Sequence, residues 1–192
     1  MIDKSTISLT PSKDPKFIQV QDLSYMQDGI CKTWEIAKTH DSVAILLIDK
    51  ANNEFLFVKQ FRPPVYLKNN DGYTYELCAG ITDKDASIEQ IAKEEILEEC
   101  GYDIALSDLI RVRGFYSAVG FAGAKQTIFF AFVDESQKVS SGGGVEGESI
   151  EVIRCKIDEV FDFFTETIAT TPAVLYAVRE YFARYANHQI VK

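Results

Sequence analysis

The residues best suited to chemistry are glutamates grouped in one stretch, Ser87 to Cys100, whose apolar residues recur with helical spacing. At about 100° per residue, the side chains of Glu95 and Glu99 project into the apolar face of this helix, whereas Glu94 and Glu98 lie on its flank. Two carboxylates on an inward face are unfavourable unless a charge neutralises them, and the sequence offers no evident cation for both. A hard divalent cation, which prefers oxygen ligands, would resolve this conflict.

The alternative interpretation is an acidic helix face in contact with water, which is the usual arrangement of glutamate-rich helices. However, Glu95 and Glu99 share their side of the helix with Ile91 and Ile96, and Gly101 follows where a left-handed C-cap belongs. The pattern therefore favours an inward pair of carboxylates and a metal site.

The surrounding residues resemble a known motif. Residues 80–102 read GITDKDASIEQIAKEEILEECGY and are similar to the Nudix box, but Ala86 replaces the first Glu of the box and Glu94 replaces its Arg. In the family this Arg braces the metal-binding glutamates. Lys93 cannot simply take its place, because one step along a helix rotates a side chain by about 100°. The positions that match are Gly80, Glu95, Ile96, Glu98, Glu99 and Gly101, with Tyr102 at the final apolar position.

The resemblance extends over most of the chain and points to the ADP-ribose and nucleotide-sugar pyrophosphatase branch of the Nudix hydrolases. It implies an enzyme that hydrolyses the diphosphate bond of UDP-glucose to UMP and glucose 1-phosphate, as animal UDP-glucose pyrophosphatases do. The alternatives are an ADP-ribose pyrophosphatase, which gives AMP and ribose 5-phosphate, and a nucleotide-sugar binding protein without hydrolysis. The segments that carry the resemblance are 33–35 (TWE), 59–64 (KQFRPP), 76–80 (ELCAG), 38–43 (KTHDSV), 118–123 (AVGFAG) with Gln126-Thr127, and 142–152 (GGGVEGESIEV).

The resemblance also implies roles for carboxylates and for one carbonyl. The carbonyl of Ala79 and the carboxylates of Glu95 and Glu99 would hold Mg²⁺, with Mn²⁺ as an alternative. The catalytic carboxylates would be Glu98, beside the metal ligands, and Glu146 and Glu148, one of which completes a metal site or positions the attacking water. Loop glutamates are otherwise usually solvated, so only the resemblance supports the last two roles.

Substrate contacts are implied for three further residues. Trp34 would stack on the base with Glu35 beside it, and Arg62 would contact the diphosphate or the sugar. In relatives the Trp-bearing segment crosses a domain-swapped dimer, so a homodimer is expected. The alternatives are a core aromatic residue for Trp34 and a charge at the end of a strand for Arg62.

The order of the expected elements predicts an α+β protein. We expect a mixed β-sheet sandwiched between helices, as in the Nudix fold, with a small N-terminal β subdomain. The domain boundaries follow as residues 1–40, an N-terminal arm and a β-hairpin that dimerises, and residues 41–192, the Nudix hydrolase domain. The expected strands are two around a turn at Asp28-Gly29, then 42–49, 54–61, 73–78, about 110–116, 126–133 and 150–156; the expected helices are 87–100, one starting near Asp158, and 172 to about 187.

The composition limits the kinds of partner that this chain can bind. Its 192 residues carry a net charge of −9, which disfavours binding to nucleic acid or to an anionic membrane. A nucleotide sugar is also an anion, so its binding needs a cation in the site. The four cysteines show no metal or redox spacing, and the N-terminus lacks an apolar signal core. We therefore expect a reduced, cytoplasmic protein with a small-molecule substrate.

Overall fold

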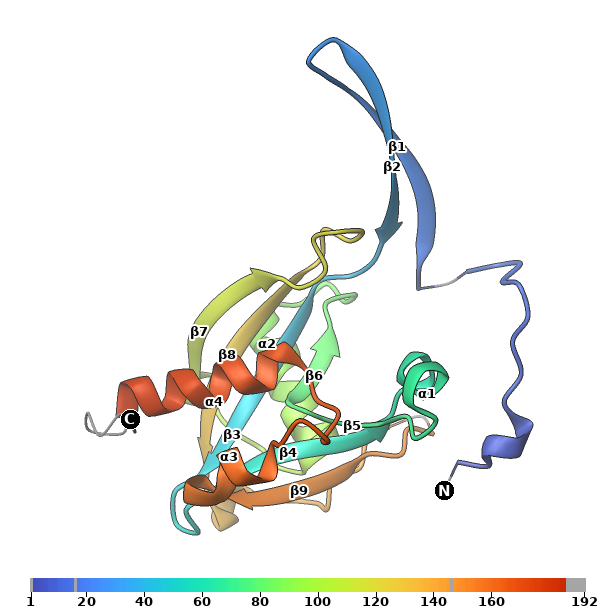
Figure 1. The fold of residues 1–192 in the computed structure, drawn as a ribbon. Coiled ribbons are helices and arrows are strands. Elements are labelled where there is room, and N and C mark those ends of the chain that lie inside the picture. The colour runs from blue at the N-terminus through green and yellow to red at the C-terminus, as the bar shows by residue number, and fades with distance from the viewer. Residues whose placement is uncertain (1, 16, 146, 186–192) are drawn as a thin grey trace.

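A computed structural model describes residues 2–15, 17–145 and 147–185 (Figure 1). Short 3-10 helices lie at Lys4–Thr6, Leu106–Asp108, Glu135–Gln137 and Ile157–Glu159. The strands are β1 (Gln19–Gln27), β2 (Ile30–Lys38), β3 (Ser42–Asp49), β4 (Glu54–Phe61), β5 (Tyr73–Glu76), β6 (Cys78–Ile81), β7 (Leu109–Tyr116), β8 (Lys125–Val133) and β9 (Glu151–Lys156). The longer helices are α1 (Pro63–Asn69), α2 (Ile88–Glu95), α3 (Val160–Phe163) and α4 (Pro172–Tyr185), and α2 continues as the π-helix η2 (Ile96–Cys100).

Strands β1 and β2 form a separate two-stranded antiparallel sheet that projects away from the rest of the molecule (Figure 1). Both residues of its turn have positive φ, 53° at Asp28 and 77° at Gly29, which is the geometry that an Asp-Gly pair accommodates in a two-residue hairpin loop. The predicted hairpin and its turn are therefore confirmed.

The other strands form a seven-stranded mixed sheet with the order β5-β4-β3-β8-β7, in which β6 also pairs with β3 and β9 with β4. Strands β3 and β4 pair only close to their connecting turn, where residues 47–49 face 54–56. Beyond that point they separate, because β6 pairs with the first half of β3 and β5 pairs with the second half of β4. The chain between β5 and β6 passes through this separation, which becomes one wall of the site described below.

Helices cover both faces of the large sheet, as the predicted α+β arrangement requires. Side chains of β3 alternate between two apolar cores, with Val43, Ile45 and Leu47 facing α2 and Ala44 among those facing α4. Burial on both faces is what the continuous apolar run SVAILLID predicts for this strand. No helix of the described residues is long and apolar enough to span a membrane.

The helix that carries the glutamates begins as predicted but ends differently. The hydroxyl of Ser87 accepts a hydrogen bond from the amide of Gln90 (3.1 Å), and Gly101 is left-handed with φ 78°. The last turn, however, is a π-turn and not a continuation of the α-helix. The side chain of Gln90, in the first turn of the helix, donates a hydrogen bond to Glu94 (3.0 Å).

Two further elements differ from the sequence-based expectation. Strand β4 ends at Phe61 as predicted, but Pro63 and Pro64 then open helix α1, which was not expected; proline is tolerated there because the first helical amides need no partner. The single strand expected over residues 73–78 is two strands, β5 and β6, which pair with different neighbours.

Candidate active site

A pocket of about 400 Å³ opens where β3 and β4 separate, and it gathers most of the predicted site residues. Arg62, Ala79, Glu95, Glu99 and Glu148 all line it, although they come from four different parts of the chain. The remaining lining residues are Ser42, Gln60, Glu76, Gly80, Ile81 and Gln126.

Glu95 and Glu99 are the two acidic groups of this pocket whose pKa values burial raises. The side chain of Glu99 is almost inaccessible, with 4% relative exposure, and Glu95 is half-buried. Burial, and to a smaller extent the charge of Glu98, raises the pKa of Glu95 to about 7, and burial raises that of Glu99 to about 8. Within the described residues neither carboxylate forms an ion pair. The inward pair expected from the helical spacing is therefore present.

Strand β6 holds these two carboxylates at close range. The amide of Ala79 donates a hydrogen bond to Glu99 Oε2 (3.0 Å). A Cβ atom at Gly80 would overlap the carboxylate of Glu95. The first glycine of the box-like motif is therefore needed for space: only a residue without a side chain lets the glutamate lie against the strand.

Arg62 has a carboxylate partner that the sequence did not reveal. Its guanidinium makes two hydrogen bonds of 2.8 Å to Glu76, which is 7% exposed and also accepts from the hydroxyl of Thr74. Burial opposes ionisation of Glu76, but the hydrogen bonds from Arg62 and Thr74 hold its pKa below the usual value. The two hydrogen bonds that Arg62 donates to Glu76, which we call the fork of Arg62, fix the guanidinium at the pocket. Nearly half of the Arg62 side chain is still exposed.

A glycine-rich loop closes over the C-terminal end of the π-helix. The amides of Gly143 and Gly144 donate to the carbonyls of Glu99 (2.9 Å) and Glu98 (3.1 Å), which satisfies carbonyls that a helix end leaves free. The same loop carries Glu148, whose carboxylate accepts from the amide of Val145 (3.3 Å). Glu146, the other predicted catalytic glutamate of this loop, lies outside the described residues.

The flank of the helix carries an ion pair at the position where the family pattern has an Arg. Glu94, which replaces the Arg of the box, is paired with Lys84 (3.1 Å) from the loop before the helix. Lys93 is paired instead with Asp103 (3.0 Å), so it does not replace the missing Arg. Glu98 is half-buried and is absent from the pocket lining, although its charge acts on Glu95.

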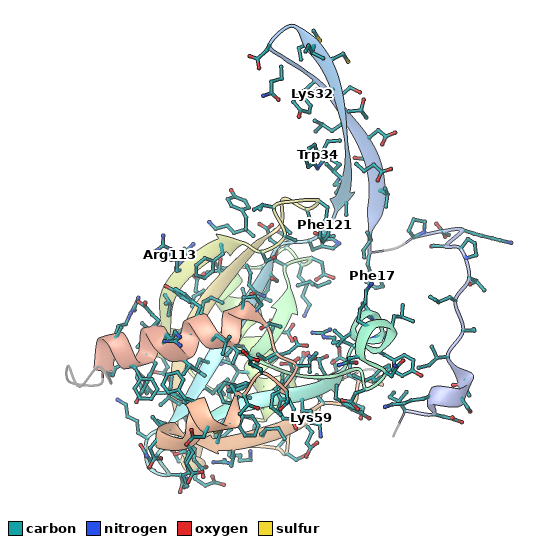
Figure 2. The ribbon with its side chains drawn as sticks, viewed as in Figure 1. Phe17, Lys32, Trp34, Lys59, Arg113 and Phe121 are labelled. Atoms are coloured by element: carbon teal, nitrogen blue, oxygen red, sulfur yellow. The ribbon has the colours of Figure 1, made fainter. Side chains whose placement is uncertain are left out.

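Trp34 and Glu35 do not line the carboxylate pocket. Both are exposed on β2, and the indole of Trp34, 53% exposed, donates from Nε1 to the carbonyl of Gly120 (2.9 Å). Figure 2 shows Trp34 near the base of the hairpin, close to Phe121 of the same loop. Trp34 borders a separate groove of about 510 Å³ between the hairpin and this loop. It is not a core aromatic residue.

The chemistry of the pocket fits a hard divalent cation. Two desolvated carboxylates lie in it with no ion-pair partner among the residues that the structure describes, which is the environment that a cation would stabilise. Across residues 2–15, 17–145 and 147–185, no three Asp, Glu, His or Cys side chains are grouped as a complete metal centre. Mg²⁺ does not need such a group, because it is usually bound by one or two carboxylates together with water and substrate phosphates.

Comparison with known proteins identifies the class to which this fold and site belong. The NUDIX domain family matches residues 38–175, and the chain belongs to this family. Over 84% of its length the chain is 38% identical to the uridine diphosphate glucose pyrophosphatase NUDT14 of Bos taurus, covering 86% of that protein. The Mus musculus protein of the same name is 37% identical over 86% of this chain and 88% of its own length. A GDP-mannose pyrophosphatase of Pectobacterium atrosepticum is 34% identical over 73% of this chain and 72% of its own length.

Proposed function

We propose that this chain hydrolyses the diphosphate bond of a nucleotide sugar with the help of Mg²⁺, and that its substrate is UDP-glucose, cleaved to UMP and glucose 1-phosphate. Membership of the NUDIX family and the names of the relatives support this proposal. The observation that carries it is the convergence of Arg62, Glu95, Glu99 and Glu148 on one pocket.

Each of these residues suits one part of such a reaction. Glu95 and Glu99, with the carbonyl of Ala79, would hold Mg²⁺ or Mn²⁺, and the bound ion would neutralise phosphate oxygens and stabilise the charge of the transition state. Arg62 would contact the diphosphate, since a guanidinium fixed by Glu76 still has N–H groups to donate. Glu148 or Glu146 would orient the water or accept its proton as it attacks phosphorus, with Glu98 nearby.

A substrate panel tests the proposal directly. Purified protein is incubated with UDP-glucose, GDP-mannose or ADP-ribose, with Mg²⁺, with Mn²⁺ or with EDTA, and the products are separated by chromatography. We expect UMP and glucose 1-phosphate from UDP-glucose, only when a metal ion is present. Faster production of AMP and ribose 5-phosphate from ADP-ribose would support the alternative substrate. Binding of these compounds without any cleavage would support a nucleotide-sugar binding protein.

The N-terminal hairpin supports a homodimer as part of the proposal. A two-stranded hairpin is marginally stable alone, yet β1 and β2 expose apolar side chains on a projecting ribbon, among them Val20, Met26 and Ile30. We propose that residues 1–40 form a dimerisation subdomain, residues 41–192 the hydrolase domain, and a second copy of the chain the surface that covers the hairpin. The partner subunit's Trp34 and Glu35 would then reach the base of the substrate.

Light scattering at micromolar concentration tests the assembly. We expect twice the chain mass of 21.6 kDa for the wild type and a monomer for the double variant Val20→Lys/Met26→Lys. Leu106→Lys, which changes an exposed leucine outside the hairpin, is the matched control and should leave the dimer intact. A wild-type monomer would reject the proposed assembly.

A cytosolic location completes the proposal. All four cysteines are free thiols, three of them buried and Cys31 exposed, and free thiols persist in reducing compartments. Fractionation of cells that produce the full chain tests this location.

A further inference from the structure

A second cavity adjoins the carboxylate pocket on the other face of the sheet. It has a volume of about 470 Å³ and lies between the sheet and the first turns of α4, which crosses that face (Figure 1). Glu76, Ala79 and Gln126 line both spaces, so the two are neighbours across a shared wall. We infer that this cavity, which we call the α4 cavity, receives the glycosyl group of the nucleotide sugar; the inference rests on the proposed function.

The walls of the α4 cavity combine apolar surface with uncharged polar groups. Ala44, Leu77 and Ala173 contribute aliphatic surface, and Phe115 and Tyr176 contribute aromatic surface. Its charged residue is Glu76, whose carboxylate is already neutralised by the fork of Arg62. A cavity of this kind suits a neutral group with apolar faces and hydroxyl edges better than it suits a second phosphate.

Hydroxyl groups on the rim are available to a ligand. The hydroxyl of Thr170 is already bound to the carbonyl of Tyr75 (2.6 Å). The hydroxyls of Ser117, Thr171 and Tyr176, which line the cavity, have no hydrogen-bond partner within the described residues. Hydroxyl groups both donate and accept, which matches the alternating donors and acceptors of a sugar.

The arrangement of the aromatic rings favours a sugar over a nucleobase. The ring centroids of Phe115 and Tyr176 are 4.6 Å apart, and their planes are inclined by 79°. Two rings in this edge-to-face contact form a corner, whereas a flat base is best held between parallel surfaces. A puckered ring with C–H groups on one face can pack into such a corner. The proposed base-stacking residue, Trp34, borders the separate groove beyond Tyr116 and not this cavity.

A side chain that fills the α4 cavity tests which end of the substrate the cavity binds, the sugar phosphate or the nucleotide. Ala173→Trp places an indole in the cavity from the first turn of α4, and Leu175→Trp places the same side chain on the exposed side of that helix as a matched control. Binding of glucose 1-phosphate and of UMP to the full chain with Mg²⁺ is measured separately by calorimetry. Since neither compound contains a diphosphate bond, the result does not depend on turnover and is separate from a failure of the proposed hydrolysis.

We expect Ala173→Trp to weaken glucose 1-phosphate binding by roughly tenfold or more, which corresponds to about 1.4 kcal/mol, and to change UMP binding little. Leu175→Trp should change neither. Loss of UMP binding alone would assign the cavity to the base and overturn the inference. Unchanged binding of both compounds, or no binding of glucose 1-phosphate to the wild type at millimolar concentration, would also overturn it.

A gentler pair of variants covers the case in which Ala173→Trp does not fold. Thr171→Val and Tyr176→Phe each remove one hydroxyl and keep the shape of the side chain. Each should weaken glucose 1-phosphate binding by roughly threefold to tenfold, the range expected for one hydrogen bond, and leave UMP binding unchanged. Equal binding of glucose 1-phosphate to both variants and the wild type would count against the inference.

Discussion

The amide of Gly143 donates a hydrogen bond of 2.9 Å to the carbonyl oxygen of Glu99. This contact fastens the glycine-rich loop to the last turn of the helix that carries both buried carboxylates. The loop and the helix therefore share one backbone junction, and Glu148 is held on one side of it while Glu99 is held on the other. A change at the junction should affect the position of both groups.

Gly142→Ala tests the junction between the loop and the helix. Gly142 has φ 71°, and a Cβ atom there would overlap the carbonyl of Glu99. We expect a loss of about 2 kcal/mol or more in the free energy of unfolding, together with a clear fall in turnover. Gly29→Ala is the matched control, because its φ is 77° but its Cβ would meet no atom within 4 Å. Gly29→Ala should lower the free energy of unfolding by only about 1 kcal/mol. Equal effects of the two substitutions would mean that the junction contributes nothing beyond backbone strain.

Arg62→Met tests whether the fork to Glu76 is structural, functional or both. Removing Arg62 leaves the buried carboxylate of Glu76 without its partner, so we expect the free energy of unfolding to fall by about 2 kcal/mol. This loss is smaller than is usual for buried ion pairs because Arg62 is half-exposed. The double variant Arg62→Met/Glu76→Leu should recover much of this stability but no activity. Lys59→Met, which breaks the ion pair between Lys59 on β4 and the exposed Glu151 on β9, should change the free energy of unfolding by less than about 0.5 kcal/mol. Recovery of activity in the double variant would remove Arg62 from the substrate site.

The pKa values of the buried glutamates predict a pH dependence of the metal-free protein. Folding raises the pKa of Glu95 to about 7 and of Glu99 to about 8, above the ordinary 4.5, so the native state retains protons that the unfolded state has lost. The free energy of unfolding in EDTA should therefore fall as the pH rises from about 5 to about 8. In Glu99→Gln this fall should be smaller and turnover should be lost. Denaturant titrations across this pH range measure both proteins, and parallel curves for the two would contradict the assignment.

The helical periodicity predicted the inward glutamates and a helix that starts at Ser87, and Gly101 was predicted as its C-cap, because these features depend on residues close in the sequence. The π-turn did not follow from that pattern. Its carbonyls are bound by Gly143 and Gly144, more than forty residues later, so its hydrogen bonding is set by tertiary contacts. The fork between Arg62 and Glu76 was also missed, since it depends on how β4 and β5 pair.

The place of Trp34 shows a different limit of the sequence. The turn at Asp28-Gly29 predicted its hairpin correctly, but a turn signal contains no information on the direction in which a hairpin leaves the sheet. Within one chain that direction puts Trp34 outside the carboxylate pocket. The base-stacking role expected from the family therefore requires a second chain, and it stays a prediction.

The ion pair between Lys84 and Glu94 leads to the last prediction. It joins the loop before the helix to the helix flank at the position where the Nudix box has an Arg. Glu94→Arg alone removes a negative charge beside Glu95 and Glu98 but places the new cation against Lys84. We therefore expect little gain in apparent Mg²⁺ affinity from this single change.

Adding Lys84→Glu restores the ion pair with its charges reversed, and an Arg with a planar fork can then brace a neighbouring carboxylate at two points. The double variant should bind Mg²⁺ at least as tightly as the wild type, with kcat unchanged or raised, as measured by Mg²⁺ titration of activity alongside thermal unfolding. If Glu94→Arg alone tightened Mg²⁺ binding as much as the double variant, Lys84 would have no part in the site. A loss of affinity and kcat in both variants would instead identify Glu94 itself as a metal ligand.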